Sequence, residues 1–185
     1  RIMHGKTRKY VLNEDEKEKY LASLKENERS RAEIARMKGL GEMDAEELEK
    51  IATVHVASRN EELLKQYNNY CICDLATIEG MEILGEYISQ NNIDILINNA
   101  GEYVYSGIEN IKLEQIEHIT RLNMEAPFYL ISKAVPYMKK QKFGRIINIG
   151  SISGVMGEAN ASLYSATKSA LIGGTKALAL ELAEF

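Results

Sequence analysis

Residues 144–168 combine a short apolar strand, a glycine-containing loop and a helix, and they restrict the fold more than any other stretch. Their sequence is GRIINIGSISGVMGEANASLYSATK. The apolar run that ends at Gly150 predicts a buried strand. Tyr164 and Lys168 are four residues apart, so on a helix they lie on the same face. The stretch therefore predicts a strand–loop–helix unit that brings a phenol and an ammonium group together.

This unit has the residue types of an acid–base site. A phenol has an ordinary pKa of about 10 and is a poor catalyst at neutral pH, but a nearby ammonium group favours the phenolate. Ser151, thirteen residues before Tyr164, stands at the carboxyl end of the strand, where it can hold a substrate oxygen. Tyr129 and Lys133 repeat the spacing without such a serine. We therefore interpret that second pair as an ordinary amphipathic pair.

Four motifs resemble the short-chain dehydrogenase/reductase family. They are IDILINNAG (93–101), LNMEAPF (122–128), GRIINIGS (144–151) and YSATK (164–168). The resemblance runs from about Thr53 to the end of the chain. It implies an incomplete doubly wound Rossmann-type parallel sheet with helices on both faces. It also implies hydride transfer with NADP or NAD, to or from a small-molecule carbonyl or alcohol of the 3-oxoacyl or sugar/alcohol type.

The resemblance assigns catalytic roles to four residues. Tyr164 is the expected general acid/base, Ser151 orients the substrate oxygen, and Lys168 assists Tyr164 and binds the nicotinamide ribose. Asn123 is expected to bind the water molecule that forms part of the family's proton relay to Lys168. Pro127 has no N–H, so the Asn123 carbonyl, four residues earlier, loses its helical partner and is free for such a water. A simple helix kink is the other interpretation of this proline.

The cofactor contacts follow from the same resemblance. Arg59 favours NADP, although a solvated loop arginine is the alternative interpretation. Tyr103 and Tyr105 are expected beside the substrate. The complete set expected to bind cofactor is Gly39, Gly41, Ser58, Arg59, Asp74, Asn99, Ala100, Gly101, Tyr164 and Lys168.

The first fifty residues differ in composition from the rest, because 24 of them are charged against 26 of the remaining 135. Residues 1–12 predict a hairpin, and residues 14–25 predict a charged helix. RIMHGKTRKYVLNEDEKEKYLASL and IARMKGLGEMDAEEL resemble the end of the metal-binding TOPRIM domain of DNA gyrase-B and related type II topoisomerases, over about residues 1–48. The family's Asp-x-Asp metal ligands are absent, so we expect no metal site and a solvated hairpin rather than a nucleic-acid site.

The two resemblances predict a chimera with domains at residues 1–31 and 32–185. Residues 32–50 would supply a borrowed first strand, a turn at Gly39 and Gly41, and a helix. The expected strand order is third, second, borrowed first, fourth, fifth. Glu33 and Arg36 interrupt the apolar run that a central parallel strand requires. The resemblance also predicts that the family's last strands are missing after Phe185.

Composition restricts the class of protein to which the chain can belong. The chain is 45% hydrophobic and 27% charged with a net charge of −4, which is typical of a globular protein and argues against general nucleic-acid binding. It has no membrane-length apolar run and no expected signal peptide. Cys71 and Cys73 are too close along one strand to bridge, which favours a cytoplasmic setting. The dehydrogenase resemblance also implies a homo-oligomer through helices 113–140 and 161–185. A gyrase-B fragment and an inactive recombinant fragment are the alternative hypotheses.

Overall fold

The computed structural model describes residues 2–4, 7–9, 14–25, 33–34 and 52–185. The chain divides into two compact units, Arg1–Val54 and His55–Phe185. This division falls after residue 54, whereas the sequence placed a domain boundary after residue 31.

The described residues of the first unit form a small antiparallel sheet and a helix. Strands β1 (Ile2–His4) and β2 (Thr7–Lys9) pair antiparallel, with Met3 opposite Arg8. Helix α1 (Glu14–Ser23) follows. The predicted hairpin and charged helix are therefore confirmed for these described residues.

Strand β3 (Glu33–Ile34) corrects the predicted strand order. It pairs antiparallel with β1, with Ile34 opposite Ile2, at one edge of the sheet β2-β1-β3. The expectation that these two residues stand in the centre of the parallel sheet is wrong. A central parallel strand is buried on both faces and requires a continuous apolar run, which Glu33 and Arg36 interrupt in the sequence. Residues 35–50, with Gly39 and Gly41, lie outside the described residues.

The second unit contains two pairs of parallel strands. Strand β4 (His55–Ser58) pairs with β5 (Asn69–Ile72), and β6 (Ile95–Asn98) pairs with β7 (Arg145–Asn148). These neighbours are the ones that the predicted order places side by side. Parallel strands need crossover connections, and here helices supply them. The carboxyl ends of all four strands carry residues that the sequence assigned to the site.

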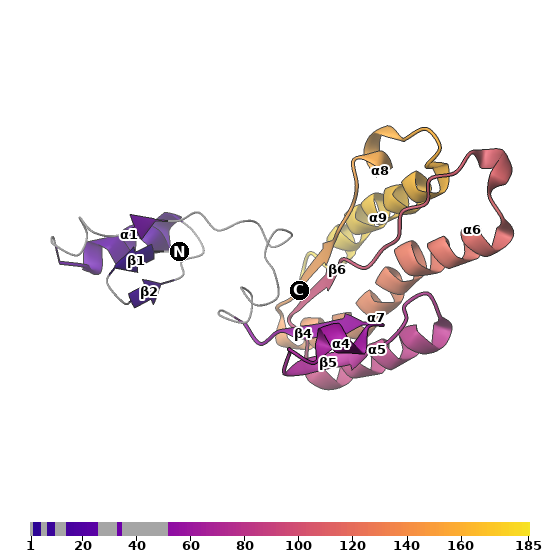
Figure 1. The fold of residues 1–185 in the computed structure, drawn as a ribbon. Coiled ribbons are helices and arrows are strands. Elements are labelled where there is room, and N and C mark those ends of the chain that lie inside the picture. Colours follow the sequence, from indigo (N-terminus) through magenta and orange to yellow (C-terminus); the bar gives the residue numbers. More distant parts are fainter. Residues whose placement is uncertain (1, 5–6, 10–13, 26–32, 35–51) are drawn as a thin grey trace. The chain divides into compact units, whose positions relative to one another are not determined.

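Helices flank these strands (Figure 1). Helix α5 begins at the N-cap Thr77, whose side chain accepts from the N–H of Gly80, and ends at Asn92 in the left-handed conformation (φ 53°). The helices of this unit are α4 (Glu61–Leu64), α5 (Ile78–Asn91), η2 (Ile108–Asn110), α6 (Leu113–Thr120), η3 (Arg121–Glu125), α7 (Ala126–Gln141), α8 (Ser153–Met156) and α9 (Ser162–Glu181).

The single long helix predicted over residues 113–140 is divided by a π-helical turn. In η3 the N–H of Ala126 donates to the carbonyl of Arg121, five residues earlier. Pro127 lies in the first turn of α7, where its missing N–H is tolerated. The proline therefore lies where η3 ends and α7 begins.

The hydrophobic core lies between the strands and helices α5 and α7. Its buried members include Leu84 and Ile88 of α5 and Leu130 and Ile131 of α7, together with Leu96 of β6. Cys71 and Cys73 are buried in the same cluster as free thiols, so the expectation that they do not bridge is confirmed.

Two glycines allow helices to approach α7 closely. A methyl group at Gly85 of α5 would lie 2.7 Å from the ring of Tyr129, and one at Gly174 of α9 would overlap the ring of Phe128. Both aromatic rings belong to α7, so this helix is held between α5 and α9. The position of α9 relative to α7 matters because the candidate residue Asn123 lies in η3, directly before α7, and Tyr164 and Lys168 lie in the first turns of α9.

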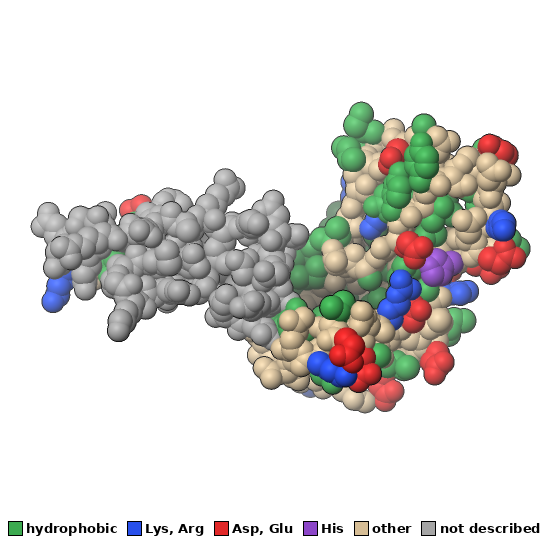
Figure 2. Space-filling view, in the orientation of Figure 1, with side chains coloured by type: hydrophobic (Ala, Val, Ile, Leu, Met, Phe, Trp, Pro, Cys, Tyr) green, Lys and Arg blue, Asp and Glu red, His purple; other side chains and the backbone are tan. Residues whose placement is uncertain are grey.

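Exposed apolar side chains gather on α8 and the loop before it, as Figure 2 shows over the end of the unit that carries α8. Ile152, Val155 and Met156 are 70%, 70% and 79% exposed. No helix in the part of the chain that the structure describes is long and apolar enough to cross a membrane. The apolar surface at α8 adjoins Ser151, and for that reason it bears on the site.

Two neighbouring residues of α5 test this packing. Leu84 is 7% exposed in the core, whereas its isomer Ile83 is 45% exposed. We expect Leu84→Ala to lower the free energy of unfolding by about 2–5 kcal/mol, because it leaves a cavity in the core. The matched change Ile83→Ala removes the same number of atoms and should cost about 1 kcal/mol or less. Urea denaturation measures both, and equal losses would contradict this description of the core.

Candidate active site

Helix α9 presents Tyr164 and Lys168 on one face, as their spacing predicts. The ammonium nitrogen of Lys168 lies 5.8 Å from the centre of the Tyr164 ring. Lys168 is only 4% exposed, and its Nζ donates to the carbonyl of Ile149 over 2.8 Å. Burial lowers the pKa of Lys168 below its ordinary value of 10.5. The cation is therefore held at the carboxyl end of β7, directly beside the phenol.

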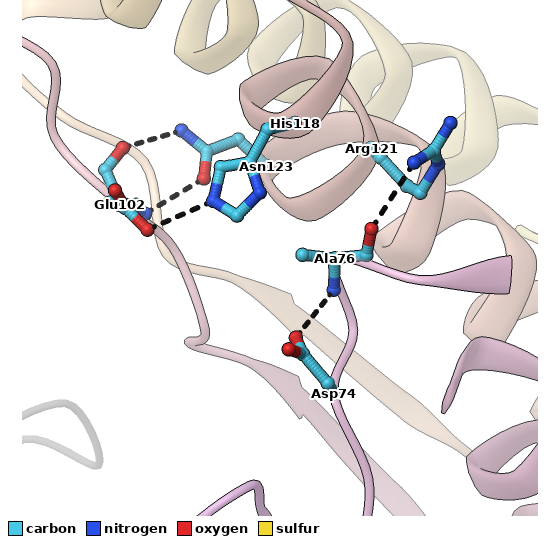
Figure 3. Close-up of polar contacts among 6 residues, drawn as sticks. All are labelled: Asp74, Ala76, Glu102, His118, Arg121 and Asn123. Atoms are coloured by element: carbon cyan, nitrogen blue, oxygen red, sulfur yellow. Dashed lines mark hydrogen bonds and ion pairs between the residues drawn. The ribbon is translucent and has the colours of Figure 1, made fainter. Parts of the chain in front are cut away.

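Asn123 lies in the π-helical turn and is fully buried. Its Oδ1 accepts from the N–H of Glu102, and its Nδ2 donates to the carbonyl of the same residue, each over 2.9 Å (Figure 3). Nδ2 also lies 3.3 Å from Oγ1 of Thr167, the residue before Lys168. Asn123 therefore connects three segments: the loop after β6, the turn before α7, and α9.

Gly101 places the amide and the ammonium group next to each other. A methyl group at Gly101 would lie 3.2 Å from Oδ1 of Asn123 and 3.4 Å from Nζ of Lys168. Both functional side chains therefore reach the same backbone position from different helices. A side chain at this position would contact both polar groups closely.

Ser151 belongs to a hydrogen-bonded chain that reaches the ring of Tyr164. Its Oγ donates to Oγ of Ser153 over 3.2 Å, and Ser153 in turn donates to Oε2 of Glu158 over 2.7 Å. The hydroxyl of Tyr103 donates to Oε1 of the same carboxylate over 2.7 Å. The ring of Tyr103 meets that of Tyr164 edge to face at 4.9 Å. Ser151 and Tyr164 are thus linked through Glu158 and Tyr103.

These contacts fix the charges at this end of the site. The hydrogen bond to Glu158 raises the pKa of Tyr103 to about 12. Hydrogen bonds, first from Ser153 and then from Tyr103, lower the pKa of Glu158. At neutral pH Glu158 is therefore a carboxylate and Tyr103 a neutral donor.

The expected cofactor residues lie at the carboxyl ends of β4, β5 and β6. The Ser58 carbonyl accepts from the Cys73 N–H over 3.1 Å, which places the ends of β4 and β5 together. Oδ1 of Asp74 accepts from the N–H of Ala76 over 3.0 Å (Figure 3). The other expected residues in this part of the chain, Arg59, Asn99 and Ala100, are exposed.

Sequence reasoning missed several of these contacts. Glu158 and Ser153 belong to none of the four sequence motifs. Only their position shortly after Ser151 in the sequence indicates that they lie near the site. Glu102 bonds through its side chain to Nε2 of His118 over 3.1 Å, in addition to its backbone contacts with Asn123 (Figure 3). Among the described residues, no group of three or more His, Cys, Asp or Glu side chains is arranged to hold a metal ion.

Comparison with known proteins decides the family. The family model described as short chain dehydrogenase matches residues 34–185. The chain belongs to this family. The match begins upstream of residue 53, where the sequence motifs first indicated it, and so it includes part of the highly charged stretch.

Curated relatives match parts of the chain. A D-beta-hydroxybutyrate dehydrogenase of Rhizobium meliloti is 44% identical over 91 residues, which cover 49% of this chain and 35% of that protein. A 3-oxoacyl-(acyl-carrier-protein) reductase of Rickettsia bellii is 37% identical over 153 residues, which cover 78% of this chain and 63% of the relative. This short-chain dehydrogenase sequence thus spans less than two thirds of the length of either relative.

Solved structures share the fold. A 4-hydroxyisoleucine dehydrogenase complexed with NADH and succinate superposes with a TM-score of 0.67 at 31% identity, over 74% of this chain and 64% of that chain. The α/β class and the parallel strands flanked by helices, which the motifs predicted, are therefore confirmed.

The burial of Lys168 has a consequence for stability. Its pKa is lowered in the folded state and returns to about 10.5 on unfolding, so between these values the unfolded chain holds more protons. The cost of burying the cation is fully present below the lowered pKa and is relieved as the pH rises toward 10.5. We expect the wild-type chain to gain unfolding free energy relative to Lys168→Met over this range. Urea denaturation of both proteins from pH 7 to pH 10.5 measures it; a constant difference would contradict the description.

Proposed function

We propose that this short-chain dehydrogenase is an NAD(P)-dependent oxidoreductase acting on a small-molecule carbonyl or alcohol. One observation carries the proposal. The Lys168 ammonium, the ring of Tyr164 and the buried amide of Asn123 meet at the carboxyl end of the strands, and Ser151 is joined to the phenol ring through Ser153, Glu158 and Tyr103. This arrangement suits proton transfer at a substrate oxygen.

The described residues fit a nicotinamide dinucleotide. An ammonium group has three donors, and one donor of Lys168 is bonded to the Ile149 carbonyl, so the others remain for ribose hydroxyls. A methyl group at Gly150, beyond β7, would meet nothing within 4 Å, which leaves open space beside this strand end. When bound, the nicotinamide supplies or accepts the hydride. We assign the adenine end to Asp74 and favour NADP over NAD because of Arg59.

The chain's own residues would handle the proton and the substrate oxygen. Tyr164 donates its proton to a carbonyl oxygen or removes one from an alcohol. Ser151 turns its hydroxyl from Ser153 to that oxygen and holds it in line. Lys168 stabilises the phenolate that forms. Asn123 positions the Glu102 backbone and holds a relay water at the carbonyl that Pro127 leaves without a helical donor.

We assign cofactor contacts to a further set of residues, namely Ser58, Asn99, Ala100 and Gly101. Gly39 and Gly41, which lie outside the described residues, are assigned to the same role.

Two Tyr-x-x-x-Lys pairs in one chain supply a matched test. Lys133 lies over the ring of Tyr129 at 4.9 Å, much as Lys168 lies over Tyr164, but on α7 facing Gly85 of α5. We expect Tyr164→Phe to abolish NADPH-dependent ketone reduction and Lys168→Met to lower its rate by about a hundredfold or more. Lys133→Met should leave the rate nearly unchanged.

The measurement is the decrease in NADPH absorbance on addition of a ketone, with cofactor binding followed separately by NADPH fluorescence. Equal effects of the two lysine replacements would refute the assignment of Tyr164. Normal turnover by Tyr164→Phe would do the same.

We also propose that the chain forms homo-oligomers through α7 and α9, within the predicted segments 113–140 and 161–185. Phe128 of α7 is 37% exposed, and Leu180 of α9 is 83% exposed. Light scattering should give a mass of at least twice the 20.8 kDa of the chain, and Leu180→Glu should shift it toward the monomer. A monomeric mass at high concentration would contradict this proposal.

The N-terminal resemblance to gyrase-B remains a hypothesis about descent. We infer no DNA cleavage activity from residues 1–48, because the resemblance there does not include the family's Asp-x-Asp ligands. A nucleic-acid partner is therefore not proposed. The reduced, buried Cys71 and Cys73 support a reducing, cytoplasm-like setting for the second unit.

A further inference from the structure

The two loops that frame Ser151 and Tyr164 carry negative charge without a matching positive charge. Residues 99–110 and 150–163 include three glutamates, Glu102, Glu109 and Glu158, and no lysine, arginine or histidine. Glu102 is paired with His118 of α6, whereas Glu158 accepts hydrogen bonds from neutral hydroxyls. These hydroxyls hold the Glu158 carboxylate in place but leave its charge unneutralised.

Glu158 is also fixed in place. Its two oxygens accept hydrogen bonds from separate segments, one from Tyr103 in the loop after β6 and one from Ser153 at the start of α8, each over 2.7 Å. Ser153 is 8% exposed, so this contact has a buried anchor. Through these two bonds the carboxylate is held next to the residues that contact Ser151 and the Tyr164 ring. A substrate whose oxygen reaches Ser151 and Tyr164 must lie close to it.

The nearby cation does not offset this charge on the substrate side. Lys168 is buried, and its Nζ is directed to the Ile149 carbonyl and the Asn123 side of the site. A carboxylate in the substrate would therefore meet Glu158 without a counter-ion, and like charges at close range repel. A neutral amide, ester or thioester at the same position meets no such repulsion.

We propose that Glu158 is a specificity-determining residue, which selects uncharged ketones and alcohols against those with a carboxylate beside the reacting carbon. The inference rests on the proposed function for the identity of the site. Of the two substrate types suggested by the relatives, it favours the 3-oxoacyl type, held as a neutral ester or thioester, over a hydroxy acid anion.

Acetoacetate and acetoacetamide test this selection, because they differ mainly by the charge of one group. Their dissociation constants are measured by ligand-observed NMR titration of the full chain with NADP present, which requires no turnover. The wild-type chain should bind acetoacetamide about tenfold more tightly than acetoacetate. Glu158→Gln should bring the two constants close together, and Glu158→Lys should favour acetoacetate.

Two further variants separate the effect of the Glu158 charge from the effect of its hydrogen bonds and of charge elsewhere in the chain. Glu181→Gln removes the same charge on α9, seventeen residues beyond Tyr164 and about 25 Å along the helix, and should leave the ratio unchanged. Tyr103→Phe keeps the Glu158 charge but removes one of its hydrogen bonds, and should reduce the ratio only in part.

The proposal is overturned if Glu158→Gln keeps the wild-type ratio, if Glu181→Gln changes it equally, or if neither probe binds the wild-type chain. A shift of the binding ratio in a chain without ketone turnover supports the selection by charge and contradicts the proposed oxidoreductase activity. Failure of the charge selection and failure of the proposed oxidoreductase activity therefore give different results.

Discussion

The buried amide of Asn123 is the interaction on which the arrangement of the site depends. It is fully buried and bonds to both backbone groups of Glu102 and to the hydroxyl of Thr167. A buried polar group left without partners costs about 1–3 kcal/mol, so the loop after β6 and helix α9 must both stay where they satisfy this amide. Because Lys168 follows Thr167, the same contact sets the position of the ammonium group.

The two charges near Tyr164 have different partners. The buried Lys168 bonds to the Ile149 carbonyl, and the exposed carboxylate of Glu158 accepts from Tyr103 and Ser153. In the proposed function the Lys168 ammonium stabilises the phenolate, and in the further inference the Glu158 carboxylate selects the substrate. This division follows from the two loops after β6 and β7, which bring residues far apart in the sequence to the same strand ends.

The local pattern alone does not distinguish the two Tyr-x-x-x-Lys pairs. In both, a lysine nitrogen lies over the tyrosine ring, at 4.9 Å for Lys133 and 5.8 Å for Lys168. Their neighbours differ, since Tyr129 packs on Gly85 of α5 and Tyr164 meets Tyr103 of a loop. The choice of Tyr164 from the sequence depended on Ser151 thirteen residues earlier and on the family motifs, and it stays a prediction.

The sequence by itself determined the order of strands and helices from residue 55 onward, because hydrophobic periodicity and helix caps act over a few residues. It also predicted the helical face shared by Tyr164 and Lys168, which is set by their spacing, and a local effect of the N–H that Pro127 lacks. Only the tertiary structure decided that β3 pairs with β1, that residues 121–125 form a π-helical turn, and that Glu158 joins Ser153 to Tyr103. Those features depend on contacts between residues distant in sequence, where pairing and burial outweigh any local preference.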